Sequence, residues 1–288
     1  RQHPHDLFMN LSVTYRRPVG AGAVWLQMAP VGEPALGPVA FMHRASSGEN
    51  PTAPLTHHWL DSTHITSDVI TAGWGRGRLG LEASVFHGRE PDEHRWNLDR
   101  GALDSISARA KLALGHGWSA QLSHGFVKNA EQLVPGDLRR TTASVHYGEE
   151  GDRRVAASLM WGRNDEEHGV SQALVAEGAW QLTLADHVFT RAEWVEKDRV
   201  LLATKGLDGE GAEDTVPVRA LTIGYLRRLG GRGSASLGLG VDLTVYGVPE
   251  SVRAAYGTRP LSTHVFARLR WGRPHGAHMH MHAGVSAP

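Results

Sequence analysis

Histidine and aspartate residues are concentrated in a few short stretches of this sequence. The chain has 18 histidines among 288 residues and no cysteine. Two clusters lie near the start, in "RQHPHD" (1–6) and "HHWLDSTHI" (57–65), and a third lies in the tail "HGAHMHMHAG" (275–284). Imidazole and carboxylate groups can bind transition metals, move protons or hold loops together, so each cluster has three chemical interpretations.

The first cluster has the spacing of a metal-binding pair. Pro4 favours an extended conformation at the preceding residue, which places His3 and His5 on the same side of the chain. The two imidazoles could share a metal ion, with Asp6 as a third ligand or as the group that orients a ligand. The alternative is that Asp6 caps a turn while both histidines donate hydrogen bonds to loop carbonyls.

The second cluster is denser. In an extended conformation His58, Ser62 and His64 would share one face, and His57 and Asp61 would share the other. A metal site would require folding to bring these residues to the first cluster and to His43. The predicted ligands are His3, His5, His43, His57, His58 and His64, with Asp6 and Asp61 as ligands or orienting carboxylates. Because ligation needs neutral imidazole, affinity should fall as the pH drops through about 6.5.

Two other interpretations of the second cluster remain open. Ser62 beside His64 could form the nucleophile and base of a serine hydrolase, which would also need an orienting group and oxyanion donors. Alternatively, the histidines, aspartates and arginines pair with one another in a plug-like loop, because buried polar groups need partners.

The tail mixes two kinds of metal ligand. His278, His280 and His282 alternate with Met279 and Met281. Imidazole together with thioether suits copper in either oxidation state, whereas zinc seldom uses methionine. The alternative is a surface tail that binds divalent ions only incidentally.

The elements that would position these clusters are β-strands. From about residue 100 the chain alternates with a period of two, as in "SASLGLGVDLTV" (234–245), where Leu and Val alternate with Ser, Gly, Asp and Thr. About a dozen such runs, many near 9–11 residues, are joined by turn sequences. One face is apolar with aromatics near strand ends, and the other carries charges and hydroxyls.

This pattern predicts an all-β fold, an antiparallel up-and-down transmembrane β-barrel of about 12–14 strands with an inserted His/Pro/Gly-rich loop. Strands are expected at 7–17, 22–30 and 62–73, with the inserted loop at about 31–64. A soluble lipocalin-like barrel or sandwich is the alternative. We expect one barrel domain over 1–272 and a His/Met-rich tail over 273–288.

The composition excludes several classes of function. Thirty basic residues balance thirty acidic ones, so nothing in the net charge favours nucleic-acid binding. The lack of cysteine excludes disulfides and thiolate metal sites. No apolar run approaches the roughly 20 residues of a membrane-spanning helix.

Three stretches resemble a known family. "RQHPHDLFMNLSVTYR", "GEPALGPVAFMHRASSGENPTAPLTHHWLDSTHIT" and "SVFHGREPDEHRWNLDRGALDS" are similar to bacterial outer-membrane barrels that are often encoded beside copper and heavy-metal resistance functions. These barrels are loosely similar in architecture to copper resistance protein B. The resemblance covers about residues 1–110 closely and the rest by its barrel pattern. It implies that further sequence precedes the "RQHPHD" motif, and that Trp271 is the aromatic residue at which the barrel finishes.

Together these observations predict a barrel in the outer membrane of a Gram-negative bacterium that binds or passes transition-metal ions. Copper is the first candidate and another divalent transition metal the second. The expected partners are outer-membrane lipid, metal ions and periplasmic metal-handling proteins. The alternatives are a passive pore with a histidine polar network and the outer-membrane serine hydrolase; only the latter would be an enzyme.

Overall fold

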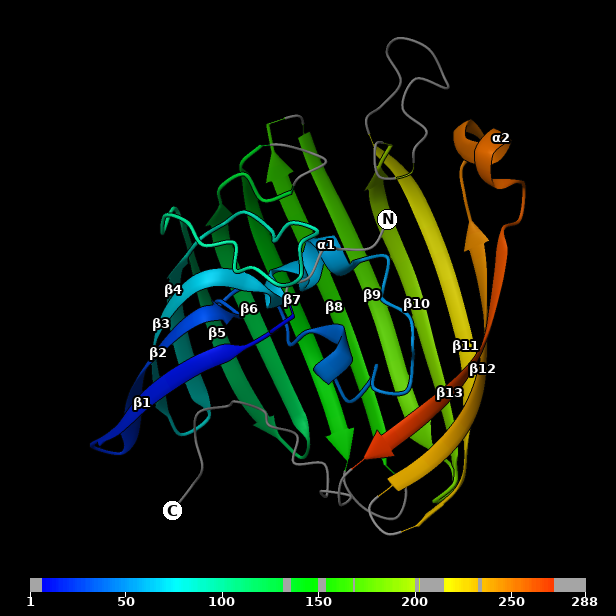
Figure 1. Ribbon diagram of the computed structural model, residues 1–288, viewed down its shortest axis with the longest axis horizontal. Helices are drawn as coiled ribbons and strands as arrows, with labels where there is room; N and C mark the ends of the chain where they lie inside the picture. Colours follow the sequence, from blue (N-terminus) through cyan, green and yellow to red (C-terminus); the bar gives the residue numbers. More distant parts are fainter. Residues whose placement is uncertain are drawn as a thin grey trace.

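The computed structural model describes residues 7–131, 136–149, 154–167, 169–199, 202, 215–232 and 235–271 (Figure 1). The candidate residues His3, His5, Asp6, His278, Met279, His280, Met281 and His282 lie outside these ranges.

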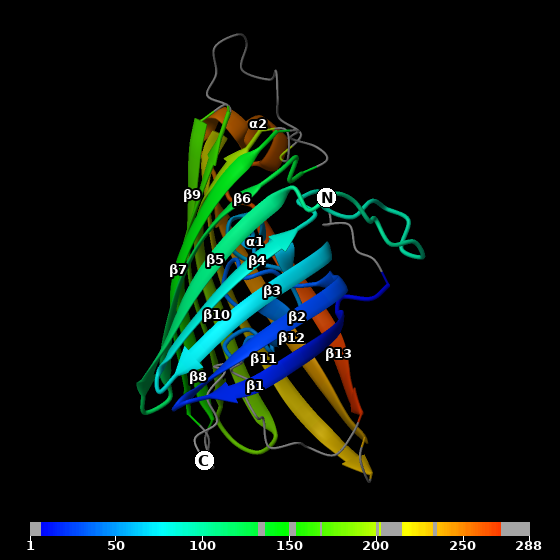
Figure 2. The same cartoon turned by 90° about the vertical axis from the view of Figure 1, so that its left-hand side faces the viewer.

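Within these ranges thirteen strands form one antiparallel sheet, and each strand pairs with its neighbours in sequence. The strands are β1 (Leu11–Val19), β2 (Gly22–Gly32), β3 (Thr66–Arg76), β4 (Leu79–Phe86), β5 (Ser105–Gly115), β6 (Trp118–Val127), β7 (Leu138–Glu149), β8 (Val155–Glu166), β9 (Gly169–Gln181), β10 (Asp186–Asp198), β11 (Thr215–Arg232), β12 (Ala235–Gly247) and β13 (Leu261–Trp271). Figures 1 and 2 show the sheet curving around an interior. The predicted all-β, up-and-down architecture and its strand number are confirmed.

The strand β12 shows which face of the sheet is outside. Its apolar residues Leu237, Leu239, Val241, Leu243 and Val245 are each 43–47% exposed, whereas Asp242 and Thr244 between them are buried. This is the reverse of a soluble protein, in which the apolar face would be buried. The apolar face therefore points outward and the polar face lines a lumen, as in transmembrane barrels.

The two ends of the sheet differ in the length of their connections. Gly20 and Ala21 suffice to join β1 to β2, and similarly tight turns join β3 to β4 and β5 to β6. At the opposite end, residues 33–65, 87–104 and 248–260 form long connections. We call these the short-turn end and the long-loop end; in bacterial barrels they are normally the periplasmic and extracellular ends, respectively.

Aromatic side chains mark the short-turn end. Trp74, Trp118, Trp180 and Trp271 are all exposed near strand termini at this end. The ring of Trp118 lies 4.9 Å from that of Tyr147 on the neighbouring strand, measured between centroids. Such a band matches the aromatic girdle expected at a membrane interface.

The two outermost strands of the sheet run in the same direction, because an even number of antiparallel steps separates β1 from β13. Within the described residues each of them pairs with one neighbour only. The edge strand β1 is exposed along its whole length.

The helices of the described region are short. They are α1 (His57–Leu60), α2 (Arg253–Tyr256) and the 3-10 turns η1 (Phe41–His43), η2 (Ser62–His64) and η3 (Glu250–Val252). Among the described residues, no helix has the length and apolar character needed to cross a membrane.

Residues 33–65, which we call the lumen segment, fold inside the curved sheet. Their helix α1 contacts β7, β8 and β9, and Figure 1 shows it on the concave side of these strands. The inserted loop was therefore predicted at the right place, but β1 begins at Leu11 and β3 only at Thr66.

The extended conformation predicted for residues 57–64 is wrong, because this stretch forms α1 and η2. The amide of Asp61 donates to the carbonyl of His57 at 3.0 Å, and that of His64 donates to the carbonyl of Asp61 at 3.2 Å. These local bonds coil the chain and place His57 and Asp61 one helical turn apart.

Candidate functional site

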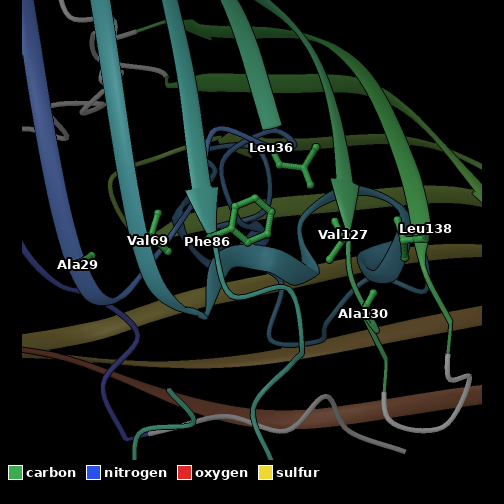
Figure 3. Close-up of a cluster of buried hydrophobic side chains, with 7 residues drawn as sticks. All are labelled: Ala29, Leu36, Val69, Phe86, Val127, Ala130 and Leu138. Atoms are coloured by element: carbon green, nitrogen blue, oxygen red, sulfur yellow. The ribbon is translucent and has the colours of Figure 1, made fainter. Parts of the chain in front are cut away.

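The lumen segment begins in an apolar cluster on the sheet wall. Leu36 packs with residues from β2, β3, β4, β6 and β7, and Figure 3 shows it near Phe86 and Val127. Two serine hydroxyls on the sheet accept hydrogen bonds from the backbone on either side of Leu36. The amide of Ala35 donates to Ser84 Oγ at 2.7 Å, and that of Gly37 donates to Ser123 Oγ at 2.8 Å.

The end of the segment is anchored on other strands. Trp59 packs in a cluster with residues of β9, β10 and β11, and its Nε1 donates to Ser171 Oγ at 2.9 Å. Leu60 packs with Met160 and Val175. A Cβ atom on Gly162 would lie 2.3 Å from the carbonyl oxygen of Trp59, so this wall position needs glycine for close approach.

Buried charges hold the middle of the segment. Arg44 donates to Asp61 within the segment and, through Nε at 2.6 Å, to Glu177 on β9. The other oxygen of Glu177 accepts from Arg191 Nε at 3.2 Å, and Arg191 also donates to Ser47 Oγ at 2.6 Å. Both ions of each pair are almost fully buried, so loss of one partner would leave an uncompensated charge.

Three imidazoles meet beside this ion network. The ring centroid of His57 lies 5.0 Å from that of His64 and 5.7 Å from that of His58. Phe41 packs edge-on against His57, with centroids 5.5 Å apart. The structure therefore brings together three of the histidines predicted as ligands, and Asp61 with them.

Each of the three imidazoles is oriented through Nδ1 by an oxygen acceptor. The distances are 2.6 Å from His57 to Asp61 Oδ1, 2.8 Å from His58 to Glu131 Oε1 and 2.8 Å from His64 to the carbonyl of Asp61. A neutral imidazole that donates through Nδ1 has its lone pair on Nε2. This arrangement is the one that orients histidines around metal ions.

The surrounding charges keep both carboxylates ionised. Burial would raise the pKa of Asp61, but the cationic Arg44 and the imidazoles of His57 and His64 outweigh it and hold this pKa well below its usual range. Burial opposes ionisation of Glu131 as well, yet His58, Arg140 and Lys197 lower its pKa to about 2. Anionic acceptors strengthen the hydrogen bonds from both imidazoles.

The other predicted site residues are placed differently. His43 is exposed at the end of η1 and has no ring contact, hydrogen bond or ion pair with the three clustered histidines in the described structure. Ser62 Oγ accepts a hydrogen bond from Arg140 at 2.8 Å, while His64 Nδ1 is bonded to the backbone. The nucleophile–base contact that a serine hydrolase would need is not formed between these residues.

Sequence reasoning missed several residues of this site. Glu131 and Glu177 are isolated charges, Arg140 follows Arg139, and Arg44 follows the predicted ligand His43, but no motif marks any of the four as a site residue. An available signal was the position of Arg140, Glu177 and Arg191 on the polar face of their strands, where a lumen charge requires a partner.

Within the described residues, no group of three or more histidine, aspartate or glutamate side chains has the arrangement of a complete metal site. The histidine cluster therefore consists of oriented imidazoles rather than a finished coordination shell.

Comparisons with known proteins show the fold. No protein-family profile and no curated protein matches the chain. Among solved structures, Salmonella typhi OmpF in complex with daunomycin is similar with a TM-score of 0.52 and 8% identity, covering 90% of this chain and 89% of that one. Outer-membrane expressed OmpT of Vibrio cholerae has a TM-score of 0.50 and 8% identity, with coverages of 91% and 88%.

The chain thus has the fold of bacterial outer-membrane β-barrels, and the outward apolar face fits the predicted location in the outer membrane. The soluble sandwich is not supported, since its core would be the apolar face that β12 exposes.

Proposed function

We propose that this outer-membrane barrel binds a transition-metal ion, copper first, at the histidine cluster in its lumen, as part of metal resistance or homeostasis. The observation that carries the proposal is the triple arrangement of His57, His58 and His64, each fixed through Nδ1 by an oxygen acceptor. A purely structural network would need hydrogen bonds, but it would not need three imidazoles with the same nitrogen engaged.

The spacing of the rings supports the same proposal. Two imidazoles bound through nitrogen to one metal at about 2 Å, at a tetrahedral angle, have centroids roughly 5 Å apart. The measured separations of 5.0 and 5.7 Å lie near this value. Small side-chain rotations would bring two Nε2 atoms to one ion.

Further ligands are those expected from the sequence. His3, His5 and Asp6 remain the first candidates to complete the shell, and the resemblance to copper-resistance barrels motivates copper as the metal. Periplasmic metal-handling proteins would then supply or receive the ion. His278, His280 and His282, with Met279 and Met281, form a separate candidate site.

The test is metal content by mass spectrometry on protein purified without an affinity tag after incubation with one equivalent of Cu²⁺. Wild type and the H57A/H58A/H64A variant are compared in an H278A/H280A/H282A background, so that the tail cannot take up the ion. We expect bound copper to fall by at least about tenfold in the cluster variant, because its ligands are removed. The control is H94A, because His94 is exposed in the loop between β4 and β5 and its side chain bonds only to Asp92 among the described residues.

A second pair of variants separates the two candidate sites. H3A/H5A should lose copper like the cluster variant, whereas H278A/H280A/H282A should retain the lumen ion. Equal copper in wild type and the cluster variant would refute the lumen site. The barrel would then be a passive pore, a function that the polar lumen face and the clamped segment would equally serve.

A further inference from the structure

A cationic cluster surrounds the tip of the lumen segment, far along the sheet from the histidine cluster. The carboxylate of Glu49 accepts from Arg268 at 2.5 Å and from Arg270 at 2.7 Å, both on β13. His187 Nδ1 on β10 lies 3.6 Å from the same carboxylate. Arg268 also donates to the carbonyl of Gly48 at 2.6 Å.

The positive charge of this cluster exceeds the negative charge that it holds. Arg228 on β11 pairs with Gly238 on β12, which in turn pairs with Arg268 on β13, so Arg228, Arg268 and Arg270 lie at the same level of the sheet. Arg228 has no ion pair within the described part of the chain, and Glu49 is the one carboxylate bonded to Arg268 and Arg270 there. With neutral His187, the balance is three positive charges against one negative charge.

Neighbouring acidic residues are already paired elsewhere. Asp242 on β12 accepts from His264 at 2.8 Å, and Asp186 accepts from Arg227 at 3.0 Å and from Tyr225. Arg227 precedes Arg228 in the sequence but points to the opposite face of the strand. The excess charge is therefore confined to the lumen face.

The cluster is accessible from one end of the lumen. Arg270 is next to the final residue of β13, and His187 follows the first residue of β10, so both lie at the short-turn end. The side chain of Arg270 is 44% exposed, whereas those of Glu49 and His187 are 12% and 6% exposed. A dissolved anion could reach the arginines without crossing the apolar face.

From this geometry we infer that His187, Arg228, Arg268 and Arg270 form a binding site for a small oxyanion, a phosphate or carboxylate group, at the short-turn mouth of the lumen. The carboxylate of Glu49 occupies part of this site and competes with the anion for Arg268 and Arg270. Guanidinium groups bind carboxylate and phosphate through the same paired donors, so the bound side chain indicates the class of ligand. This inference is independent of metal binding.

The test is isothermal titration of the full chain in zwitterionic micelles with inorganic phosphate. E49Q removes the competing charge and should bind phosphate at least about tenfold more tightly than wild type. Adding R270Q to E49Q should reverse this gain, because it removes a charge-assisted donor. Adding R227Q instead should change affinity by less than about twofold, since Arg227 carries the same charge on the outer face.

Circular dichroism in the same micelles verifies that each variant is folded. A folded E49Q protein without saturable phosphate binding would overturn the inference, as would an equal loss in the R227Q and R270Q double variants. A parallel titration with micelles containing phosphatidylglycerol distinguishes the source of the anion. Binding of the lipid but not of free phosphate would assign the arginines to a headgroup and also overturn the solute site.

Discussion

Asp61 is the residue that couples the two halves of the candidate site. One of its oxygens accepts from Arg44 in the buried ion network, and the other accepts from His57 in the histidine cluster. Its backbone carbonyl orients His64. The side chain of Asp61 thus holds the segment through Arg44 and orients His57, while the backbone of the same residue orients His64.

Replacing Asp61 with Asn should therefore impair both stability and metal binding. D61N keeps the shape of the side chain but leaves buried Arg44 with Glu177 as its remaining carboxylate partner, at a cost of about 3–5 kcal/mol in the free energy of unfolding. Urea unfolding followed by tryptophan fluorescence measures this loss. D92N, in the loop between β4 and β5, should stay within about 0.5 kcal/mol of wild type. Unchanged stability of D61N would mean that the Arg44–Asp61 pair is not essential.

At the scale of elements, the lumen segment depends on close contact between its own ends. Gly37 has a φ of +82°, and a Cβ atom there would lie 2.0 Å from the carbonyl oxygen of Leu60. Alanine at this position would be strained by its backbone conformation and would also push α1 away. Both effects act on the segment and leave the strands intact.

Gly20 is a matched control for the contact between Gly37 and Leu60. It also has a positive φ, +57°, but no atom lies within 4 Å of its ideal Cβ position. G20A should cost about 1–2 kcal/mol in unfolding free energy from the left-handed conformation alone. G37A should cost about 1–3 kcal/mol more, because overpacking is added. Thermal unfolding of the two variants measures the difference. Equal costs would show that the two ends of the segment do not need this approach.

Arginine substitutions on β12 test whether its apolar face contacts the membrane. Val241 lies in the middle of β12 and Val245 near its long-loop end, with similar exposure of 44% and 46%. Arginine on the lipid face costs about 2–4 kcal/mol at the bilayer midplane and about 0–1 near the interface. V241R should therefore destabilise the barrel in lipid vesicles more than V245R, as measured by urea unfolding. Equal effects would contradict the membrane band proposed for this face.

The strands and the lumen segment were not equally predictable from the sequence. The alternation in β12 predicted its two faces correctly, since a strand has the same period whatever its surroundings. The same period applied to residues 57–64 failed. There Trp59 and Leu60 are adjacent but pack on different wall clusters, a requirement set by the curved sheet and absent from the local pattern.

The ion pairs between the lumen segment and the strands could not be predicted from local sequence for a similar reason. Arg44 and Glu177 are 133 residues apart, and Glu49 and Arg270 are 221 residues apart. The curvature and register of the whole sheet decide which polar wall residue meets which part of the segment. Sequence periodicity predicts that such a wall residue faces the lumen, but it does not identify its partner.

At the scale of the whole molecule, the lumen segment connects opposite parts of the wall. It bonds to β4 and β6 at its start, to β9 and β10 in its middle, and to β13 at Glu49. The last strand is therefore tied to the interior as well as to β12. A barrel whose interior is crossed in this way should pass solutes only around the segment.

Removing the segment should accordingly increase conductance. Because Gly37 and Leu60 are in contact, residues 38–59 can be replaced with a short Gly-Ser linker while β2 and β3 keep their register. In planar lipid bilayers we expect the single-channel conductance of this variant to rise several-fold, since pore width sets flow through the lumen. H57A/H58A/H64A retains the segment and should conduct like wild type. If the deletion conducts no better than wild type, the segment does not limit passage; if the histidine variant alone opens the channel, the imidazoles themselves form the constriction.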